Sequence, residues 1–245
     1  MPAVTVSIDR HCATLSLSNG RQNVIDFAVM EELAASLTEI EQDPRVTTIV
    51  LRGDGENFSA GVDIPSHTPD KVATMLEKFH TAVRLMARSS KVLLAEVRGN
   101  CLGGGAELAL MCDMVFTTPD ARWGFPEITL ACFPPVACAV LAVCVGQKRA
   151  AELVLTGRSF TGADAAAYGL ANAAGDASAL TRAAVEQLGA RSSQVLPIAK
   201  RALYAWHAVH WDKALAHAER LYLDELVKQP DMERAIRDWS ERKPK

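Results

Sequence analysis

The first half of the chain alternates short apolar runs with amphipathic stretches. Residues 4–8 and 13–17 alternate apolar side chains with polar or small ones, and an Asn-Gly pair follows the second run, which predicts two strands joined as a hairpin. Residues 27–40 then place apolar side chains at helical spacing, and Asp26 stands where an N-cap would satisfy the first free backbone amides. The opening segment therefore predicts a strand, strand, helix unit.

Strand and helix patterns keep alternating up to residue 117. Buried strands are predicted at residues 47–51, 92–97 and 114–117, and helices at residues 70–87 and 103–111. Alternation of this kind is typical of an α/β body.

After about Gly146 the strand signals almost vanish and Ala-rich helical patterns replace them. Helices are predicted at residues 148–155, 163–168, 180–190 and 197–206. Residues 214–226 place their apolar side chains on one stripe, which indicates a helix that packs on the body or on a neighbouring subunit. We therefore divide the chain into a core, residues 1–190, and a C-terminal helical region, residues 191–245.

Composition and charge exclude several classes of protein. The 245 residues are 49% hydrophobic and 22% charged, as expected for one large domain or two small ones. The 26 Lys and Arg against 29 Asp and Glu give a net charge of −3, so no bulk basic field favours nucleic acid or a membrane surface. The longest apolar stretch, residues 137–145, is shorter than the ~20 residues that span a bilayer, and no signal-peptide pattern opens the chain. We expect a cytoplasmic protein.

The six cysteines lie mostly inside apolar runs. They form no Cys-x-x-Cys pair and have no histidine at zinc-site spacing, so no metal site is expected. Because a chain of this length can bury a sufficient core without disulfides, we expect reduced, buried thiols.

Three consecutive glycines, Gly103 to Gly105, follow a predicted strand and open a predicted helix. Such a segment lets backbone approach a ligand closely and aims free amides at it, which favours developing negative charge. A close strand-to-helix crossing is the plainer alternative. The segment has neither the dinucleotide fingerprint nor a Walker lysine, so neither standard kind of phosphate binding is supported.

Two glutamates follow in apolar surroundings. Glu107 stands in the first turn of the predicted helix, either as a charge partner of the helix N-terminus or as a buried working carboxylate, with a surface carboxylate as the alternative. Glu127 follows an aromatic-Gly-aromatic-Pro turn, where burial without partners would be unfavourable. Two such carboxylates perturb each other's ionisation, so that one can stay protonated while the other is charged, as an acid and a base acting on one water require.

Residues 57–64, 103–108 and 123–128 together resemble, in order and separation, the motifs of the crotonase (enoyl-CoA hydratase and isomerase) superfamily. The resemblance extends over the whole chain. It implies an α/β fold in which a spiral of ββα units carries a helical C-terminal trimerisation region. It also implies an acyl-CoA substrate, a homotrimer or homohexamer, and no separate cofactor, because coenzyme A is part of the substrate.

The resemblance assigns roles at individual positions. The backbone N–H groups of Val62 and Gly104 match the two donors of the family's oxyanion hole, which stabilise the enolate formed from the thioester. Glu107 and Glu127 match the two catalytic carboxylates of the hydratases. We assign water activation mainly to Glu107 and protonation of the α-carbon mainly to Glu127, a division that depends on the model chosen for a coupled pair.

The substrate pocket both follows and departs from the family. By resemblance, the backbone near Asn23, Val24, Ala60 and Asp63 contributes to coenzyme A binding. The usual glycine-rich stretch after the second glutamate is replaced here, and Phe133, Pro135 and Val136 are expected to reshape the acyl pocket. Pro135 stands where the family has a glycine whose N–H helps to hold the catalytic water, and proline has no N–H to offer.

This departure is similar to that of a smaller branch of the family, the cyclohexa-1,5-diene-1-carbonyl-CoA hydratases, which act in anaerobic degradation of aromatic compounds. A flat ring needs a broad apolar wall rather than the tunnel that suits a linear acyl chain. Further stretches that agree with this branch are residues 23–26, 67–70, 98–103 and 221–226.

Other functions stay open at this point. Within the family, the alternatives are a short-chain linear enoyl-CoA hydratase of fatty acid metabolism and an isomerase that uses Glu127 alone. RNA binding is disfavoured because the basic side chains of the helix predicted within residues 71–91 fall on opposite sides and form no single stripe. A catalytically dead acyl-CoA-binding protein is disfavoured because both glutamates are present.

Overall fold

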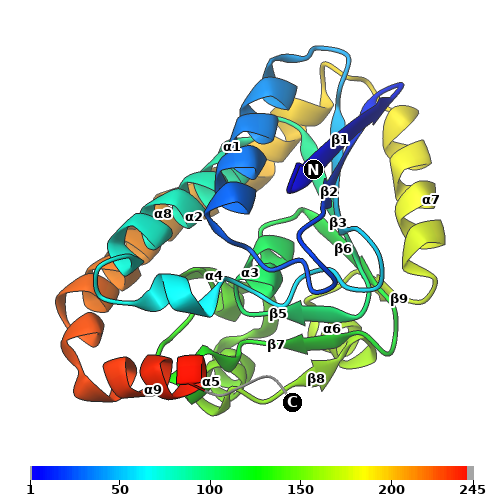
Figure 1. Ribbon diagram of the computed structural model, residues 1–245. Helices are drawn as coiled ribbons and strands as arrows, with labels where there is room; N and C mark the ends of the chain where they lie inside the picture. The colour runs from blue at the N-terminus through cyan, green and yellow to red at the C-terminus, as the bar shows by residue number, and fades with distance from the viewer. Residues whose placement is uncertain (1, 242–245) are drawn as a thin grey trace.

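A six-stranded sheet forms the frame of the molecule, in a computed structural model that describes residues 2–241, apart from the side chains of residues 205–210 (Figure 1). The strand order is β1-β2-β3-β4-β6-β9. β1 and β2 pair as the predicted antiparallel hairpin, and every later pair in the sheet is parallel. The strands are β1 (Val4–Asp9), β2 (Cys12–Leu17), β3 (Thr48–Gly53), β4 (Val92–Val97), β6 (Met114–Thr117) and β9 (Ala173–Ala174).

A second, three-stranded sheet lies beside the first and was not predicted. It joins β5 (Asn100–Leu102), β7 (Arg122–Gly124) and β8 (Phe160–Thr161) in the order β5-β7-β8. Strands of two or three residues are too short to show an alternating pattern. The small sheet nevertheless sets the site, because β5 leads directly into the glycine segment.

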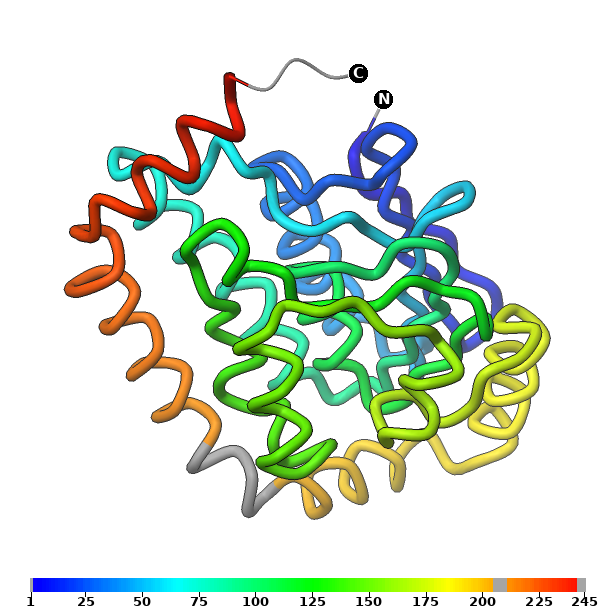
Figure 2. Tube along the Cα trace, turned by 90° about the horizontal axis from the view of Figure 1, so that it is seen from below, coloured from blue at the N-terminus to red at the C-terminus, as the bar shows by residue number. Residues whose placement is uncertain are grey.

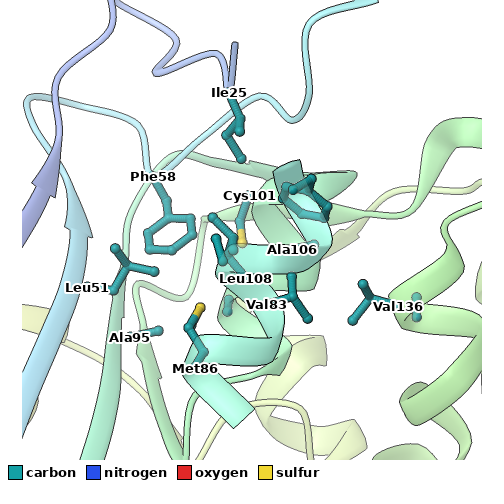
Figure 3. Close-up of a cluster of buried hydrophobic side chains, with 14 of the residues drawn as sticks. Ile25, Leu51, Phe58, Val83, Met86, Ala95, Cys101, Ala106, Leu108 and Val136 are labelled. Carbon is teal, nitrogen blue, oxygen red and sulfur yellow. The ribbon is translucent and has the colours of Figure 1, made fainter. Parts of the chain in front are cut away.

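The helices of the first half pack their apolar faces on the frame. α1 (Phe27–Gln42) begins as predicted at Asp26, whose side chain accepts a hydrogen bond from the N–H of Val29 at 3.0 Å. α2 (Val72–Arg88) and the short α3 (Gly104–Leu110) follow. Figure 3 shows buried side chains of the sheet, α2 and α3 gathered around one point, among them Leu51, Ala95, Val83, Met86, Ala106 and Leu108.

The second half is helical, as predicted, but its helices are longer and more numerous. One helix of 29 residues, α8 (Leu196–Asp224), occupies the region where two separate helices were predicted. It runs alongside α2 and contacts it, and α9 (Pro230–Glu241) follows across the end of the molecule (Figures 1 and 2). The remaining helices are α4 (Pro135–Val145), α5 (Gln147–Thr156), α6 (Gly162–Tyr168) and α7 (Ala177–Gly189). The division after residue 190 falls in the connection between α7 and α8 and stays a prediction.

The cysteines differ in part from the prediction. All six are free thiols, and Cys12, Cys101 and Cys132 are buried. Cys138 and Cys144 are exposed, so the expectation of burial is wrong for these two. The reason is that α4 is apolar on every side, and only one face of it can meet the core.

Within residues 2–241, no helix combines the length and the apolar character that crossing a membrane requires.

Candidate active site

A cavity of about 410 Å³ lies between the parts of the chain that carry the predicted motifs. One side is formed by residues 60–62 and by the start of α3. The 3-10 turn η2 (Pro126–Leu130) and the start of α4 form the next side. Side chains of α2, α8 and α9 close it. The cavity therefore joins segments from the first motif to the last helix.

Glu107 enters the cavity from the first turn of α3 and is only 3% exposed. Its Oε1 accepts hydrogen bonds from the N–H of Val136 at 2.8 Å and of Ala137 at 2.9 Å. These amides belong to the first turn of α4, whose dipole favours a negative charge. Burial raises the pKa of Glu107 to about 7, and the two amide hydrogen bonds act in the opposite direction.

Glu127 enters the same cavity from η2. Its Oε2 is buried and meets no hydrogen-bond partner among the described residues. Burial, and then the negative charge of Glu107, raise the pKa of Glu127 well above its ordinary value. The structure thus brings the two carboxylates together in one largely enclosed space, where they repel each other when both are charged. One protonated and one ionised carboxyl is the favoured state near neutral pH.

The residues expected to supply the two oxyanion donors, Val62 and Gly104, both line the cavity. Ile25 donates to the carbonyl of Gly61 at 2.9 Å and accepts from the N–H of Asp63 at 3.0 Å. In this parallel bridge the N–H of the intervening Val62 points away from Ile25. Gly104 opens α3, where the first amides have no partner within the helix.

Glycines allow these groups to approach one another. A Cβ on Gly104 would lie 2.6 Å from Cγ2 of Val62, so the two proposed donors are direct neighbours. Gly103 has a φ of +52°, and a Cβ there would lie 2.7 Å from Oε1 of Glu127. A side chain at Gly103 would therefore clash with the Glu127 carboxyl, and one at Gly104 would clash with Val62.

Only some of the other predicted substrate-binding residues line the cavity. Ala60, Phe133 and Pro135 line the cavity, whereas Asn23, Val24, Asp63 and Val136 are not among its lining residues. The side chain of Asn23 donates to the carbonyls of Asp54 and Asn57 and so fixes neighbouring loops. Oδ2 of Asp63 accepts from Ser66, and Val136 contributes its N–H to Glu107.

Two polar side chains of the cavity lining, from α2 and α8, were not predicted from the sequence. Tyr222 of α8 is 1% exposed, and its hydroxyl has no hydrogen-bond partner among the described residues. His80 of α2 is fully buried; its Nδ1 lies 2.7 Å from Oε1 of Glu219, while its Nε2 has no partner among the described residues. Both side chains line the cavity, as does Trp239 of α9. Tyr222 lies on the stripe predicted within residues 214–226, which indicated packing and gave no sign of a cavity.

Comparison with known proteins gives a consistent result. A family model described as enoyl-CoA hydratase/isomerase matches residues 8–245. Cyclohexa-1,5-dienecarbonyl-CoA hydratase of Thauera aromatica is 33% identical over 231 residues, which cover 94% of this chain and 90% of that protein. 2,3-Dehydroadipyl-CoA hydratase of Escherichia coli is 31% identical over 231 residues, covering 91% of this chain and 89% of that protein.

Solved structures resemble the whole chain in fold. An enoyl-CoA hydratase/isomerase from Mycobacterium paratuberculosis has a TM-score of 0.90 at 22% identity, covering 97% of this chain and 98% of that one. An enoyl-CoA hydratase/isomerase from Xanthobacter autotrophicus has a TM-score of 0.86 at 28% identity, covering 99% of both chains. The α8 and α9 region is thus included in the likeness, together with the sheets.

Proposed function

The chain belongs to the enoyl-CoA hydratase/isomerase family and is a hydratase-type enzyme, and on that premise we propose that it adds water to the ring of a cyclic dienoyl-CoA, cyclohexa-1,5-diene-1-carbonyl-CoA. The observation that carries the chemistry is the pair of carboxyl groups, Glu107 and Glu127, which share one cavity and have raised pKa values.

The proposed reaction begins at the thioester. Its carbonyl oxygen accepts hydrogen bonds from the N–H groups of Val62 and Gly104, which stabilise the charge that develops there. Ionised Glu107 takes a proton from water as the water oxygen bonds to one alkene carbon of the ring. Protonated Glu127 then delivers a proton to the carbon at the other end of the reacting π-system. The atoms of one water are added and no electrons are exchanged, so the reaction needs no redox cofactor and no metal ion. Coenzyme A enters as part of the substrate.

The acyl side of the cavity supports the choice of a ring. Its wall is formed by Met75, Leu76 and Phe79 of α2 and by Phe133, which precedes α4. The ring of Phe133 lies 5.2 Å from that of Tyr222, at an interplanar angle of 59°. Two of the four apolar side chains in this wall are aromatic rings, against which a flat substrate can pack. The hydratase of Thauera aromatica, similar over nearly the whole chain, is named for this cyclic acyl group.

A side-by-side assay tests the proposal. Purified protein is given cyclohexa-1,5-diene-1-carbonyl-CoA or the linear crotonyl-CoA, and the change in absorbance that accompanies the loss of one conjugated C=C bond is followed. We expect a higher kcat/KM with the cyclic substrate. A preference for crotonyl-CoA would indicate a short linear acyl group as the substrate instead of a ring. Double-bond migration without water uptake would indicate an isomerase.

We also propose that the chain assembles as a homotrimer or homohexamer. Large apolar side chains are exposed on neighbouring helices, Val143 of α4 at 65% and Leu155 of α5 at 69%, and contact with a second copy would remove them from water. Light scattering coupled to size-exclusion chromatography would give the mass. Coenzyme A contacts of the backbone near Asn23, Val24, Ala60 and Asp63 stay a proposal.

A further inference from the structure

The start of α4 offers no free backbone donor to the cavity. Pro135 is the first residue of the helix and has no N–H. The next two N–H groups, of Val136 and Ala137, both donate to Oε1 of Glu107. A water held between the carboxylates can therefore donate its two protons to them, but it finds no hydrogen-bond donor for its oxygen on this helix.

The hydroxyl of Tyr222 is such a donor elsewhere in the lining of the cavity. It belongs to α8, lines the same cavity, and has no hydrogen-bond partner among the described residues. It lies beside the thiol of Cys132; burial first, then this thiol and the negative charges of Glu127 and Glu107, raise the pKa of Tyr222 well above its ordinary value. A buried hydroxyl without a partner is unfavourable unless a bound molecule completes it.

Contacts on both sides hold Tyr222 in this position. Its ring packs on that of Phe133. Three residues earlier, and so on the same face of α8, Oε1 of Glu219 accepts hydrogen bonds from Nη2 of Arg84 at 2.6 Å and meets Nδ1 of His80 at 2.7 Å. Both partners are on α2, so charged contacts fix α8 against α2 next to the cavity.

We infer that Tyr222 is a catalytic residue whose hydroxyl donates a hydrogen bond to the oxygen of the reacting water, in place of the backbone N–H that Pro135 lacks. The water then has three fixed contacts, Glu107, Glu127 and Tyr222, which determine the direction of its attack. Tyr222 transfers no proton in this scheme. The inference rests on the proposed water addition and is independent of which acyl group is used.

The variant Tyr222→Phe tests it, because it removes the hydroxyl and keeps the ring. We expect kcat with the better of the two substrates to fall roughly 10- to 100-fold, with KM changed less than about threefold, as for loss of one positioned hydrogen bond in the transition state. The thermal midpoint should not fall, since the hydroxyl makes no hydrogen bond within the described protein. Tyr168→Phe, the same change on α6 outside the cavity, serves as the control.

Two results would overturn the inference. One is a kcat for Tyr222→Phe within about twofold of the wild type. The other is a raised KM at unchanged kcat, which would mean that Tyr222 contacts the acyl group and not the water. A wild-type protein that hydrates neither substrate would instead refute the proposed function itself, and the wild-type assay reveals this before the variant is compared.

Discussion

The backbone N–H of Val136 donates a hydrogen bond of 2.8 Å to Oε1 of Glu107. This contact joins the first turn of α4 to the first turn of α3. Oε1 is thus hydrogen-bonded within the protein, and Oε2 can contact a molecule in the cavity. The orientation of the Glu107 carboxylate therefore depends on α4, a helix that follows the second glutamate in the chain.

Replacing either glutamate by glutamine should abolish water addition. Glu107→Gln removes the base and Glu127→Gln removes the proton donor, and each loss is expected to lower kcat by about 10² to 10⁴. The absorbance assay measures both. Glutamine keeps the size of the side chain, so circular dichroism should show unchanged folding. Full hydration activity in Glu107→Gln would refute the two-carboxylate mechanism, whereas double-bond migration that tolerates this variant would indicate an isomerase.

The hydration rate should depend on pH through the coupled pair. Burial raises the pKa of Glu107 to about 7, and the base must be ionised to accept a proton from water. We expect kcat/KM to fall as pH drops below about 7, with the apparent pKa belonging to the pair. A profile that stays flat down to the ordinary pKa range of carboxyl groups would show that burial does not raise the pKa of Glu107.

The contribution of Glu107 to the free energy of unfolding should fall as pH rises, whereas the hydration rate should rise. A carboxyl whose pKa is raised from 4.5 to about 7 binds its proton more tightly in the folded state. Its contribution is complete below the unfolded pKa and is lost as pH rises through 7. Urea unfolding should show that Glu107→Gln gains free energy of unfolding relative to the wild type on going from about pH 5 to pH 8. A constant difference would contradict the raised pKa.

Gly104→Ala should impair catalysis more than folding. The new Cβ would lie 2.6 Å from Cγ2 of Val62 and 3.2 Å from Cζ of Phe79, so Val62, Phe79 or the start of α3 must shift. We expect kcat to fall about 10²-fold or more, as when one oxyanion donor is lost. Gly175→Ala is the matched control, because its Cβ would approach only the end of the Leu180 side chain, at 3.3 Å. Equal activity in the two variants would refute the assigned donors.

A rescue experiment tests whether Tyr222 and Pro135 affect the same water. If both positions serve the same water, Pro135→Gly introduces an N–H that can replace the lost hydroxyl. In the Tyr222→Phe background it should recover part of kcat, although glycine lowers stability by about 0.5 to 1 kcal/mol. Steady-state kinetics of the single and double variants give the coupling energy. Strictly additive losses would show that the two positions act independently.

The order of elements could be predicted from the sequence because the long elements repeat a clear pattern. α1 with its Asp26 cap, β4 and β6 are confirmed nearly to the residue, and the relatives confirm the crotonase fold. The three-stranded sheet was not predicted because strands of two or three residues are too short to show a periodic pattern. α4 gave no helical signal because it is apolar on all faces, so its periodicity is absent.

The site residues that could be predicted are charged residues in otherwise apolar stretches of the sequence. Glu107 and Glu127 stood out as charges among apolar residues, and both line the cavity. Tyr222 and His80 did not stand out, because an aromatic or histidine on an apolar helical stripe is ordinary core. Only the approach of α8 to α2, fixed by contacts far apart in the chain, reveals that the Tyr222 hydroxyl and Nε2 of His80 have no hydrogen-bond partner among the described residues.

Trp239 of the final helix lines the cavity while 40% of its surface is exposed, so it lies at the rim. It is distant in sequence from the residues proposed to move protons. Evolution can therefore alter the entrance by drift in α9 while the reacting groups stay the same. Orthologues that keep the glutamate pair but differ at this rim are expected to diverge in the compounds they degrade and to share one reaction.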